Sequence, residues 1–207
     1  MKIEALLFDL GKVLIDFNFD TGLQALQACC SMSRDEFHQV VFDKRWIRRY
    51  ERGEISTSQY HTYLCETANL KMEFPDFCQT WSSVFLPDLI VSEELLKALK
   101  RRYPLILISN TNEAHIEYIR EKYRVLEYFD SHILSYQVGS LKPDAKIFEY
   151  AIAASGHQPE SLFFTDDREE NILAAERLGM QAHQFVSEPR LIEALQGAGV
   201  ELGDFVY

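Results

Sequence analysis

The sequence contains no apolar run long enough to cross a membrane. Within its 207 residues no hydrophobic segment approaches the roughly 18 residues that a spanning helix needs. The first apolar segment, Ala5–Phe8, is too short for the core of a signal peptide. We therefore expect neither an export signal nor a membrane partner.

Cysteine is scarce and shows no paired spacing. The chain has four cysteines, Cys29, Cys30, Cys65 and Cys78, and no two of them form a CxxC pair. In a chain without an export signal, such cysteines are typical of reduced thiols packed inside the protein. We expect a cytoplasmic location.

Positive charge is in the minority. The sequence has 21 Lys and Arg against 32 Asp and Glu, which gives a formal net charge of −11. An acidic surface repels nucleic acid and anionic lipid, so we expect no nucleic-acid partner. It also repels phosphate, so any site that binds phosphate needs a local cation.

Apolar residues, 47% of the chain, are sufficient for a sizeable core and are arranged in short runs. Five runs predict buried strands at Ala5–Phe8, Leu105–Ile108, His132–Leu134, Leu162–Phe164 and Ala182–Phe185. Helical patterns alternate with them and begin near Ser92, Asn112, Pro143, Glu169 and Pro189. This alternation predicts an α/β fold with a doubly wound, Rossmann-like parallel sheet.

One stretch departs from the alternation. Between Asp16 and about Leu86 no strand is predicted, and amphipathic helical segments rich in aromatic residues occupy the interval. We expect an α/β core domain of residues 1–16 plus 89–207 and an inserted α-helical cap domain of residues 17–88. A plain helical subdomain and a cap that closes over a site are both compatible with this pattern.

Polar side chains follow the predicted strands at the sheet edge where such folds bind ligands. They are Asp9, Ser109 with Asn110, Lys142, and Asp166 with Asp167. Clustered carboxylates repel one another, and Mg²⁺, which prefers oxygen ligands, relieves that repulsion. A bound anion can then be held by Ser109, by N–H groups at a helix start and by Lys142, while Asp9 attacks phosphorus.

Each of these residues has an ordinary structural explanation when it is considered alone. Asp9 is explained as a turn residue, the Asp166–Asp167 pair as a helix cap, and Lys142 as a solvated lysine. Their occurrence together, in this order, is what predicts a phosphate-handling site.

The same residues lie in four motifs that resemble those of the haloacid-dehalogenase superfamily. They read Phe-Asp-Leu-Gly-Lys-Val-Leu at 8–14, Leu-Ile-Ser-Asn-Thr-Asn at 107–112, Gly-Ser-Leu-Lys-Pro-Asp at 139–144 and Phe-Phe-Thr-Asp-Asp-Arg-Glu-Glu-Asn-Ile at 163–172. The insert resembles the helical cap of one large branch. Within the insert, the stretch Tyr-Glu-Arg-Gly-Glu-Ile-Ser at 50–56 is similar to the sequences of the bacterial alpha-D-glucose-1-phosphate phosphatase group, which belongs to that branch.

The resemblance implies a Mg²⁺-dependent phosphatase acting on a small phosphate ester, a sugar phosphate being the expected class, through an aspartyl-phosphate. It implies that Asp9 is the nucleophile, that Ser109 and the Asn110 backbone hold the phosphoryl group, and that Lys142 steadies the transferred charge. It assigns the metal to Asp9, the carbonyl of Gly11, Asp166 and Asp167, and adds Leu10 and Gly11 to the substrate contacts.

Gly11 is the main departure from the superfamily pattern. Phosphatases of the superfamily usually carry a second aspartate there, which protonates the leaving oxygen and activates water, and loss of such a group typically costs about 10²–10⁴ in rate. Three consequences of this glycine remain open: the enzyme is slow, it prefers esters with a good leaving group, or another group such as Asp16 takes over the acid–base role. For Asp16, a structural role in a turn fits better. The glucose-1-phosphatase resemblance also carries glycine here.

Other polar and aromatic residues have two interpretations each. His115 is expected to be solvated or to cap a helix rather than to touch substrate, and His183 is expected to pack in a strand. In the cap, Trp46, Tyr50 and Arg52 are candidates either for a sugar ring or for the cap core and the seam between cap and core.

Two further functions remain as alternatives. One is a catalytically weak protein that binds a phosphate ligand, and the other is a metal-free 2-haloacid dehalogenase, which Gly11 and the acidic pair disfavour. The sequence is compatible with a monomer or a homodimer.

Overall fold

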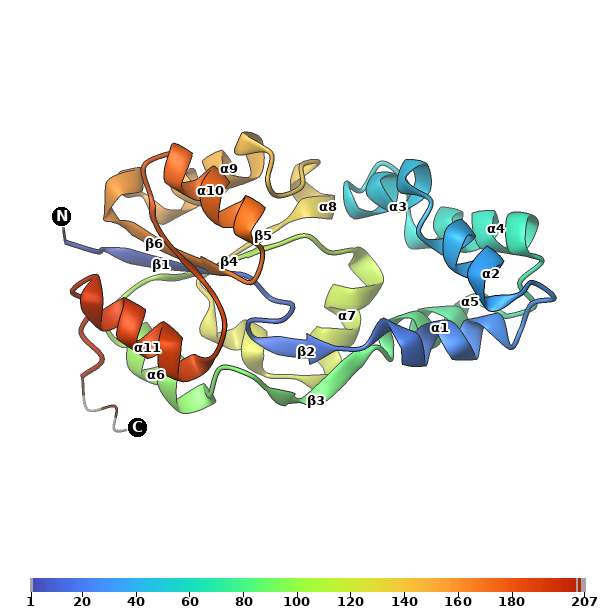
Figure 1. Cartoon of the computed structure of the whole chain (residues 1–207), viewed down its shortest axis with the longest axis horizontal. Coiled ribbons are helices and arrows are strands. Elements are labelled where there is room, and N and C mark those ends of the chain that lie inside the picture. The colour runs from blue at the N-terminus through green and yellow to red at the C-terminus, as the bar shows by residue number, and fades with distance from the viewer. Residues whose placement is uncertain (1, 204, 206–207) are drawn as a thin grey trace.

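A five-stranded parallel sheet lies at the centre of the computed structural model, which describes residues 2–203 and 205. The strands are β1 (Ala5–Phe8), β4 (Leu105–Ser109), β5 (Ser131–Leu134), β6 (Leu162–Asp166) and β7 (Gln181–Gln184). Their order is β5-β4-β1-β6-β7, and every neighbouring pair is parallel (Figure 1). All five strands match segments predicted from apolar runs.

Strand β1 is the point where the order of strands reverses. Its Leu7 lies opposite Ile106 of β4 on one side and Phe164 of β6 on the other. From β1 the chain builds the sheet outward through β4 and β5, and then returns to add β6 and β7 on the other side. Ligands bind at such a reversal, outside the carboxyl ends of the strands.

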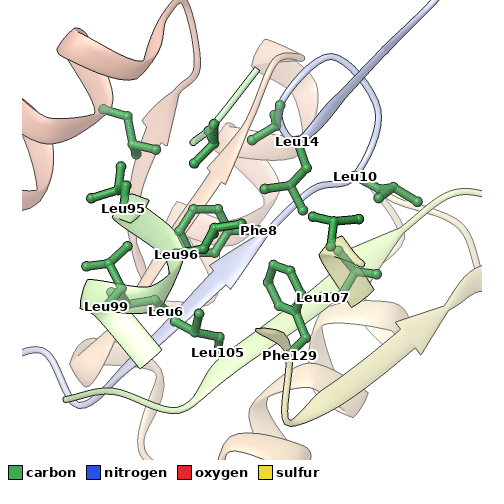
Figure 2. Packing of buried hydrophobic residues seen from close by; sticks show 14 of the residues in the cluster. Leu6, Phe8, Leu10, Leu14, Leu95, Leu96, Leu99, Leu105, Leu107 and Phe129 are labelled. Carbon is green, nitrogen blue, oxygen red and sulfur yellow. The ribbon is translucent and has the colours of Figure 1, made fainter. Parts of the chain in front are cut away.

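Helices cover both faces of the sheet because side chains along each strand alternate between two cores. Leu6 and Phe8 enter one core, together with residues of α6 (Glu93–Lys100), α7 (Glu113–Lys122) and α11 (Glu188–Gly197). Figure 2 shows Leu95, Leu96 and Leu99 of α6 packed in this cluster.

The opposite face carries the second core. Ala5 and Leu7 point into it and meet residues of α9 (Ala145–Ser155) and α10 (Glu169–Arg177). The sheet is therefore buried on both sides, which explains why its strands read as continuous apolar runs. The predicted doubly wound α/β fold is confirmed.

Side-chain caps start the helices where the sequence predicts them. Ser92 accepts a hydrogen bond from the N–H of Leu95, and Asn112 accepts one from the N–H of His115. Gly156 ends α9 with a φ of 71°, a left-handed conformation that glycine adopts without steric cost. Side-chain caps thus begin α6 and α7, and a left-handed glycine ends α9.

The stretch between β1 and β4 is largely helical, as expected. It contains α1 (Phe19–Gln27), α2 (Arg34–Val41), α3 (Lys44–Glu51), α4 (Thr57–Ala68) and α5 (Phe74–Ser82). These helices project to one side of the sheet (Figure 1) and share an aromatic core of their own. The division into domains at residues 17 and 88 stays a prediction.

Two short strands in this stretch were missed. β2 (Ile15–Phe17) pairs antiparallel with β3 (Phe85–Leu89) at the two ends of the helical insert. The expectation of no strand between Asp16 and Leu86 is therefore wrong. A three-residue strand shows no periodicity, and β3 is half-exposed and contains Pro87, so only the long-range pairing defines them.

Three further short helical segments lie in the part of the chain that the structure describes. They are α8 (Ser135–Val138) and two turns of 3₁₀-helix, Val125–Tyr128 and Pro159–Ser161. None of the helices in the described residues is both long and apolar enough to span a membrane.

Candidate active site

A cleft of about 240 Å³ opens at the carboxyl edge of the sheet, where β1, β4 and β6 end. Seven of the eight residues predicted for the site line this cleft: Asp9, Leu10, Gly11, Ser109, Asn110, Lys142 and Asp167. The eighth, Asp166, lies below the cleft with none of its surface exposed. The fold thus brings residues more than 150 positions apart in the chain into one place.

Lys142 is the central cation of the site. Its ammonium lies 2.7 Å from Asp9 Oδ1 and 2.5 Å from Asp166 Oδ2, and it also donates to the carbonyl of Ile108 at 2.9 Å. Its side chain is only 1% exposed, so the solvated lysine is excluded. Burial alone would lower the pKa of Lys142, but the carboxylates of Asp166 and Asp9 offset burial and raise that pKa.

Lys142 contacts the carboxyl groups of Asp9 and Asp166, and Asp167 adds a third carboxyl group to the same cluster, so the carboxyl groups outnumber this lysine. Burial raises the pKa of Asp9, and Lys142 offsets this effect only in part. Burial and the nearby Asp166 also raise the pKa of Asp167. The site therefore favours a further cation.

The carboxylates are placed to supply that cation with ligands. One oxygen from each of Asp9, Asp166 and Asp167 lies within 4.8 Å of the others. Three carboxylate oxygens are a hard donor set, which suits Mg²⁺ and leaves positions for water and a substrate oxygen. The residues present therefore fit the expected metal.

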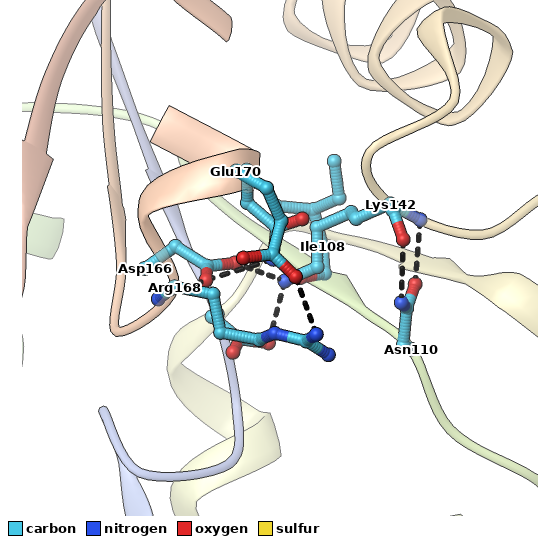
Figure 3. Close-up of polar contacts among 8 residues, drawn as sticks. Ile108, Asn110, Lys142, Asp166, Arg168 and Glu170 are labelled. Atoms are coloured by element: carbon cyan, nitrogen blue, oxygen red, sulfur yellow. Dashed lines mark hydrogen bonds and ion pairs between the residues drawn. The ribbon is translucent and has the colours of Figure 1, made fainter. Parts of the chain in front are cut away.

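Asp166 is fixed by the start of the helix that follows it. Its Oδ1 accepts hydrogen bonds from the N–H of Arg168 at 2.9 Å and from Asn171 Nδ2 at 2.8 Å. Figure 3 shows Asp166 between this helix and Lys142. Asp166 thus fixes the turn that precedes α10 and holds the lysine, while Asp167 faces the cleft.

Asn110 has a role that its motif did not indicate. Its Nδ2 donates to the carbonyl of Lys142 at 2.9 Å, and its Oδ1 accepts from the N–H of Lys142 at 2.7 Å (Figure 3). This reciprocal pair ties the loop after β5 to the end of β4. The amide therefore positions the backbone that carries the central cation.

Ser109, the last residue of β4, lines the cleft with 2% of its surface exposed. The N–H of Thr111 donates to Ser135 Oγ at 2.9 Å and is not available to a ligand. Helix α7 begins only at Glu113. At this corner the cleft therefore presents the Ser109 hydroxyl and the chain next to it rather than the N-terminus of α7.

His115 is buried, so the expectation that it is solvated is wrong. Its ring stacks on Trp81, its Nε2 lies 3.3 Å from the Trp81 carbonyl, and its Nδ1 lies 3.1 Å from Asn112 Nδ2. These partners make Nε2 the donor and Nδ1 the acceptor of a neutral imidazole. Burial lowers the pKa of His115 to about 4. His183 stacks on Phe163, as expected of a packing residue.

The aromatic and basic candidates of the insert fill its core and its seam with the sheet domain. Trp46 stacks on Tyr63 inside the insert and does not line the cleft. Tyr50 is buried, and its hydroxyl lies 3.0 Å from Asn112 Oδ1. Arg52 pairs with Asp144 at 3.1 Å. Tyr50 and Arg52 therefore belong to the seam.

Asp16 does not supply an acid to the cleft. It forms an ion pair with Lys12 on the surface, and the hydrogen bond from Lys12 lowers its pKa. The residue is absent from the cleft lining, which is consistent with the turn role.

The cleft also contains residues that were not predicted for the site, among them Arg168, Asn171 and Glu51. Arg168 and Asn171 line the cleft from the start of α10, and Glu51 lines it from the end of α3. Burial raises the pKa of Glu51 to about 7. All three lie within or beside quoted motifs, but only the packed structure shows which members of those motifs face the cleft.

The fold and the acidic cleft are those of the haloacid dehalogenase-like hydrolases. Residues 3–179 match this family, and the chain belongs to it. The chain is 27% identical over 192 residues to a D-ribitol-5-phosphate phosphatase from Bacteroides thetaiotaomicron, with 88% of this chain and 91% of that protein covered.

Two solved structures are similar over most of their length. A predicted HAD-like family hydrolase from Porphyromonas gingivalis is 26% identical with a TM-score of 0.80, covering 97% of this chain and 100% of its own. A HAD family enzyme from Bacteroides thetaiotaomicron, solved as a magnesium complex, is 26% identical with a TM-score of 0.77, covering 90% and 95%.

Proposed function

We propose that the protein is a Mg²⁺-dependent phosphatase that hydrolyses a small phosphate monoester through an aspartyl-phosphate on Asp9. The observation that carries the proposal is the arrangement of Asp9, Ser109, Lys142 and Asp167 around one cleft at the carboxyl edge of the sheet. The site has a nucleophile, a hydroxyl donor and a buried cation, together with the carboxylates that a metal needs. Membership of a hydrolase family supports the same reaction type.

Asp9 has the position of the nucleophile. It directly follows the central strand, its Oδ1 is paired with Lys142, and its surface is 8% exposed. Attack of its carboxylate on phosphorus forms the acyl phosphate and breaks the ester P–O bond. Lys142 and the Ser109 hydroxyl then stabilise the charge on the phosphoryl oxygens.

Asp9, Asp166 and Asp167 would hold the metal, and the Gly11 carbonyl would supply a further oxygen. When bound, Mg²⁺ supplies charge stabilisation for the transferring phosphoryl group and orients it toward the nucleophile. A solved relative of this family contains magnesium, which supports the choice of ion.

The substrate class we propose is a phosphorylated sugar or polyol. The cleft, at about 240 Å³, suits a small ester rather than a large one. D-Ribitol 5-phosphate is the substrate named for one relative, and the motif at residues 50–56 favours D-glucose 1-phosphate. The two esters differ in leaving group, since one releases a primary alcohol and the other a hemiacetal.

The experiment is phosphate release from D-ribitol 5-phosphate, D-glucose 1-phosphate, a pyrimidine nucleotide and p-nitrophenyl phosphate. Wild type and Asp9→Asn are each assayed with Mg²⁺ and with EDTA. We expect turnover that EDTA abolishes and that Asp9→Asn lowers by at least about 10³. Mg²⁺-dependent activity that survives Asp9→Asn would contradict the proposal.

Two further measurements, binding of inorganic phosphate and release of halide, separate the two alternatives. A weak phosphate-binding protein would bind inorganic phosphate and turn over none of the esters. A haloacid dehalogenase would release halide from a 2-haloacid in the presence of EDTA. The three clustered carboxylates disfavour the dehalogenase. A dehalogenase binds no metal, so the repulsion among these carboxylates would have no metal ion to offset it.

A further inference from the structure

Hydrolysis of an alkyl phosphate needs a proton donor in the cleft, because an alkoxide is a poor leaving group. Asp9 is occupied as nucleophile, and Asp167 as metal ligand. The residue two positions after Asp9 is Gly11, which has no side chain. The donor must therefore come from another lining residue.

A side chain at position 11 would displace the ring of Phe17. A Cβ built there lies 2.7 Å from Cε1 of Phe17. The Phe17 ring is held against Phe19, at a centroid distance of 4.9 Å, and against Phe85 at 6.4 Å. The wall of the cleft at this point is aromatic, so no acid replaces the missing one locally.

Most other lining residues are unable to give up a proton. His115 is neutral, and both of its ring nitrogens have partners in Asn112 and Trp81. Lys142 is buried between two carboxylates. Arg168 carries a guanidinium that does not deprotonate in proteins.

Glu51 is the remaining carboxyl group among the described residues that line the cleft. It is the last residue of α3 and comes from the helical insert rather than from the sheet domain. Within the described part of the chain, its carboxylate makes no hydrogen bond and no ion pair. A half-buried acid that lines the cleft without a protein partner is free to act on a ligand.

The insert is fastened to the sheet domain at the residues on either side of this acid. The Tyr50 hydroxyl lies 3.0 Å from Asn112 Oδ1, and the carbonyl of Glu51 accepts from Ser135 Oγ at 2.7 Å. Arg52 pairs with Asp144 at 3.1 Å. Three successive residues thus bind the core, so the backbone of Glu51 has a defined position over the cleft.

The surroundings of Glu51 favour its protonated form. Burial raises the pKa of its carboxyl to about 7, and Arg168 and Arg48 offset this only in part. The negative end of the helix dipole acts in the same direction at the C-terminus of α3. Near neutral pH both the acid and its conjugate base are populated, as a residue that first gives and then takes a proton requires.

We propose that Glu51 is the acid–base residue of this site and replaces the side chain that Gly11 lacks. The inference rests on the proposed phosphatase function. As Asp9 attacks phosphorus and the ester P–O bond breaks, the Glu51 proton passes to the leaving oxygen. The Glu51 carboxylate then takes a proton from water, whose oxygen attacks the aspartyl-phosphate. This step breaks the P–O bond to Asp9, releases phosphate and restores both residues.

The test measures how the rate depends on the leaving group. Wild type, Glu51→Gln and Glu54→Gln are compared with Mg²⁺ on p-nitrophenyl, phenyl and butyl phosphate, none of which has a hydroxyl for Glu51 to bind. Glu54 is a matched control because it is exposed, three residues away and outside the cleft. Thermal melts at pH 8 establish that each variant is folded.

For Glu51→Gln we expect kcat/KM on butyl phosphate to fall by about 10² or more, and on p-nitrophenyl phosphate by less than about 10-fold. The decline of wild-type kcat/KM above pH 7 on butyl phosphate should disappear in this variant. An equal loss on all three esters, or no loss, overturns the role of Glu51 while wild-type turnover upholds the phosphatase. Absence of turnover by the wild type overturns both.

Discussion

The ammonium of Lys142 lies 2.7 Å from a carboxylate oxygen of Asp9, although 132 residues separate the two in the chain. Both side chains are almost inaccessible, and Asp166 closes the group from below. One buried cation therefore neutralises part of the charge on two buried carboxylates. Removing the Lys142 ammonium therefore measures how much the folded protein depends on this charge neutralisation.

Replacement of Lys142 by Met should lower the free energy of unfolding by about 3–5 kcal/mol in EDTA, because it leaves two buried carboxylates unpaired. Urea unfolding at pH 8 measures the change. Lys146→Met, on the exposed face of α9, is the control and should change stability by less than about 0.5 kcal/mol. Equal stability of Lys142→Met and wild type would show that these carboxyl groups are neutral without the lysine.

Mg²⁺ should stabilise the folded protein by mass action. At a concentration of about 100 times its dissociation constant, a ligand of the folded state contributes about 2.7 kcal/mol. We expect the melting temperature to rise with MgCl₂, to return with EDTA, and to respond much less in Asp167→Asn. Asp16→Asn removes a nearby surface carboxylate outside the cleft, and its full Mg²⁺ response would exclude a general surface effect.

Replacement of Gly53 by Ala should disrupt the seam between the insert and the sheet domain. Gly53 has a φ of 68°, and a Cβ there would lie 2.0 Å from the carbonyl oxygen of Tyr136. We expect a loss of roughly 2–3 kcal/mol in chemical unfolding, from left-handed strain plus displacement of α8. The substitution should also lower kcat/KM, since Glu51 is held by the same seam.

Gly156 offers a control for that substitution. It has a similar φ of 71°, but nothing lies within 4 Å of a Cβ placed there. Gly156→Ala therefore carries only the strain of the left-handed backbone, about 1–2 kcal/mol. If Gly53→Ala and Gly156→Ala lose the same stability and activity, the close contact between Gly53 and the Tyr136 carbonyl makes no contribution to either.

His115 should make the folded state sensitive to acid. Its pKa is about 4 in the folded protein against about 6.5 when unfolded, so the unfolded chain binds more protons between these values. Stability from this group is complete above about pH 7 and is lost as pH falls toward 4, with a loss on the order of 2 kcal/mol at pH 5.

The measurement is the change in unfolding free energy between pH 8 and pH 5 for wild type and His115→Gln. The variant should lose on the order of 2 kcal/mol less over this interval, whatever its stability at pH 8. His132→Gln, at a half-buried strand position, serves as the control. An unchanged pH dependence in His115→Gln would mean that the imidazole is not held neutral.

The strands and the order of elements were predictable because they follow from local patterns. Leu105–Ile108 and Leu162–Phe164 read as continuous apolar runs because their strands are covered on both faces. Ser92 and Asn112 marked helix starts because a side-chain cap acts within three residues. Parallel strands align their carboxyl ends at one edge of the sheet. This rule predicted that one cleft would contain Asp9, Ser109, Lys142 and Asp167.

Features that depend on long-range packing were not predictable. β2 and β3 are too short to show a period, and each exists because it pairs with the other across the insert. His115 appeared exposed because its motif resembles a polar helix start, yet Trp81 and Phe85 cover it. The amide of Asn110 gave no sign that it binds the backbone of Lys142.

The sequence by itself determined the doubly wound fold, the helical insert and the residues of the sheet edge, since periodicity and capping are local and parallel topology has few solutions. Only the tertiary structure decided the ionisation and partners of those residues. Lys142 is buried between Asp9 and Asp166, and Glu51 faces the cleft, because the seam and the sheet bring distant segments together. Burial and charge at such contacts are properties of the packed chain.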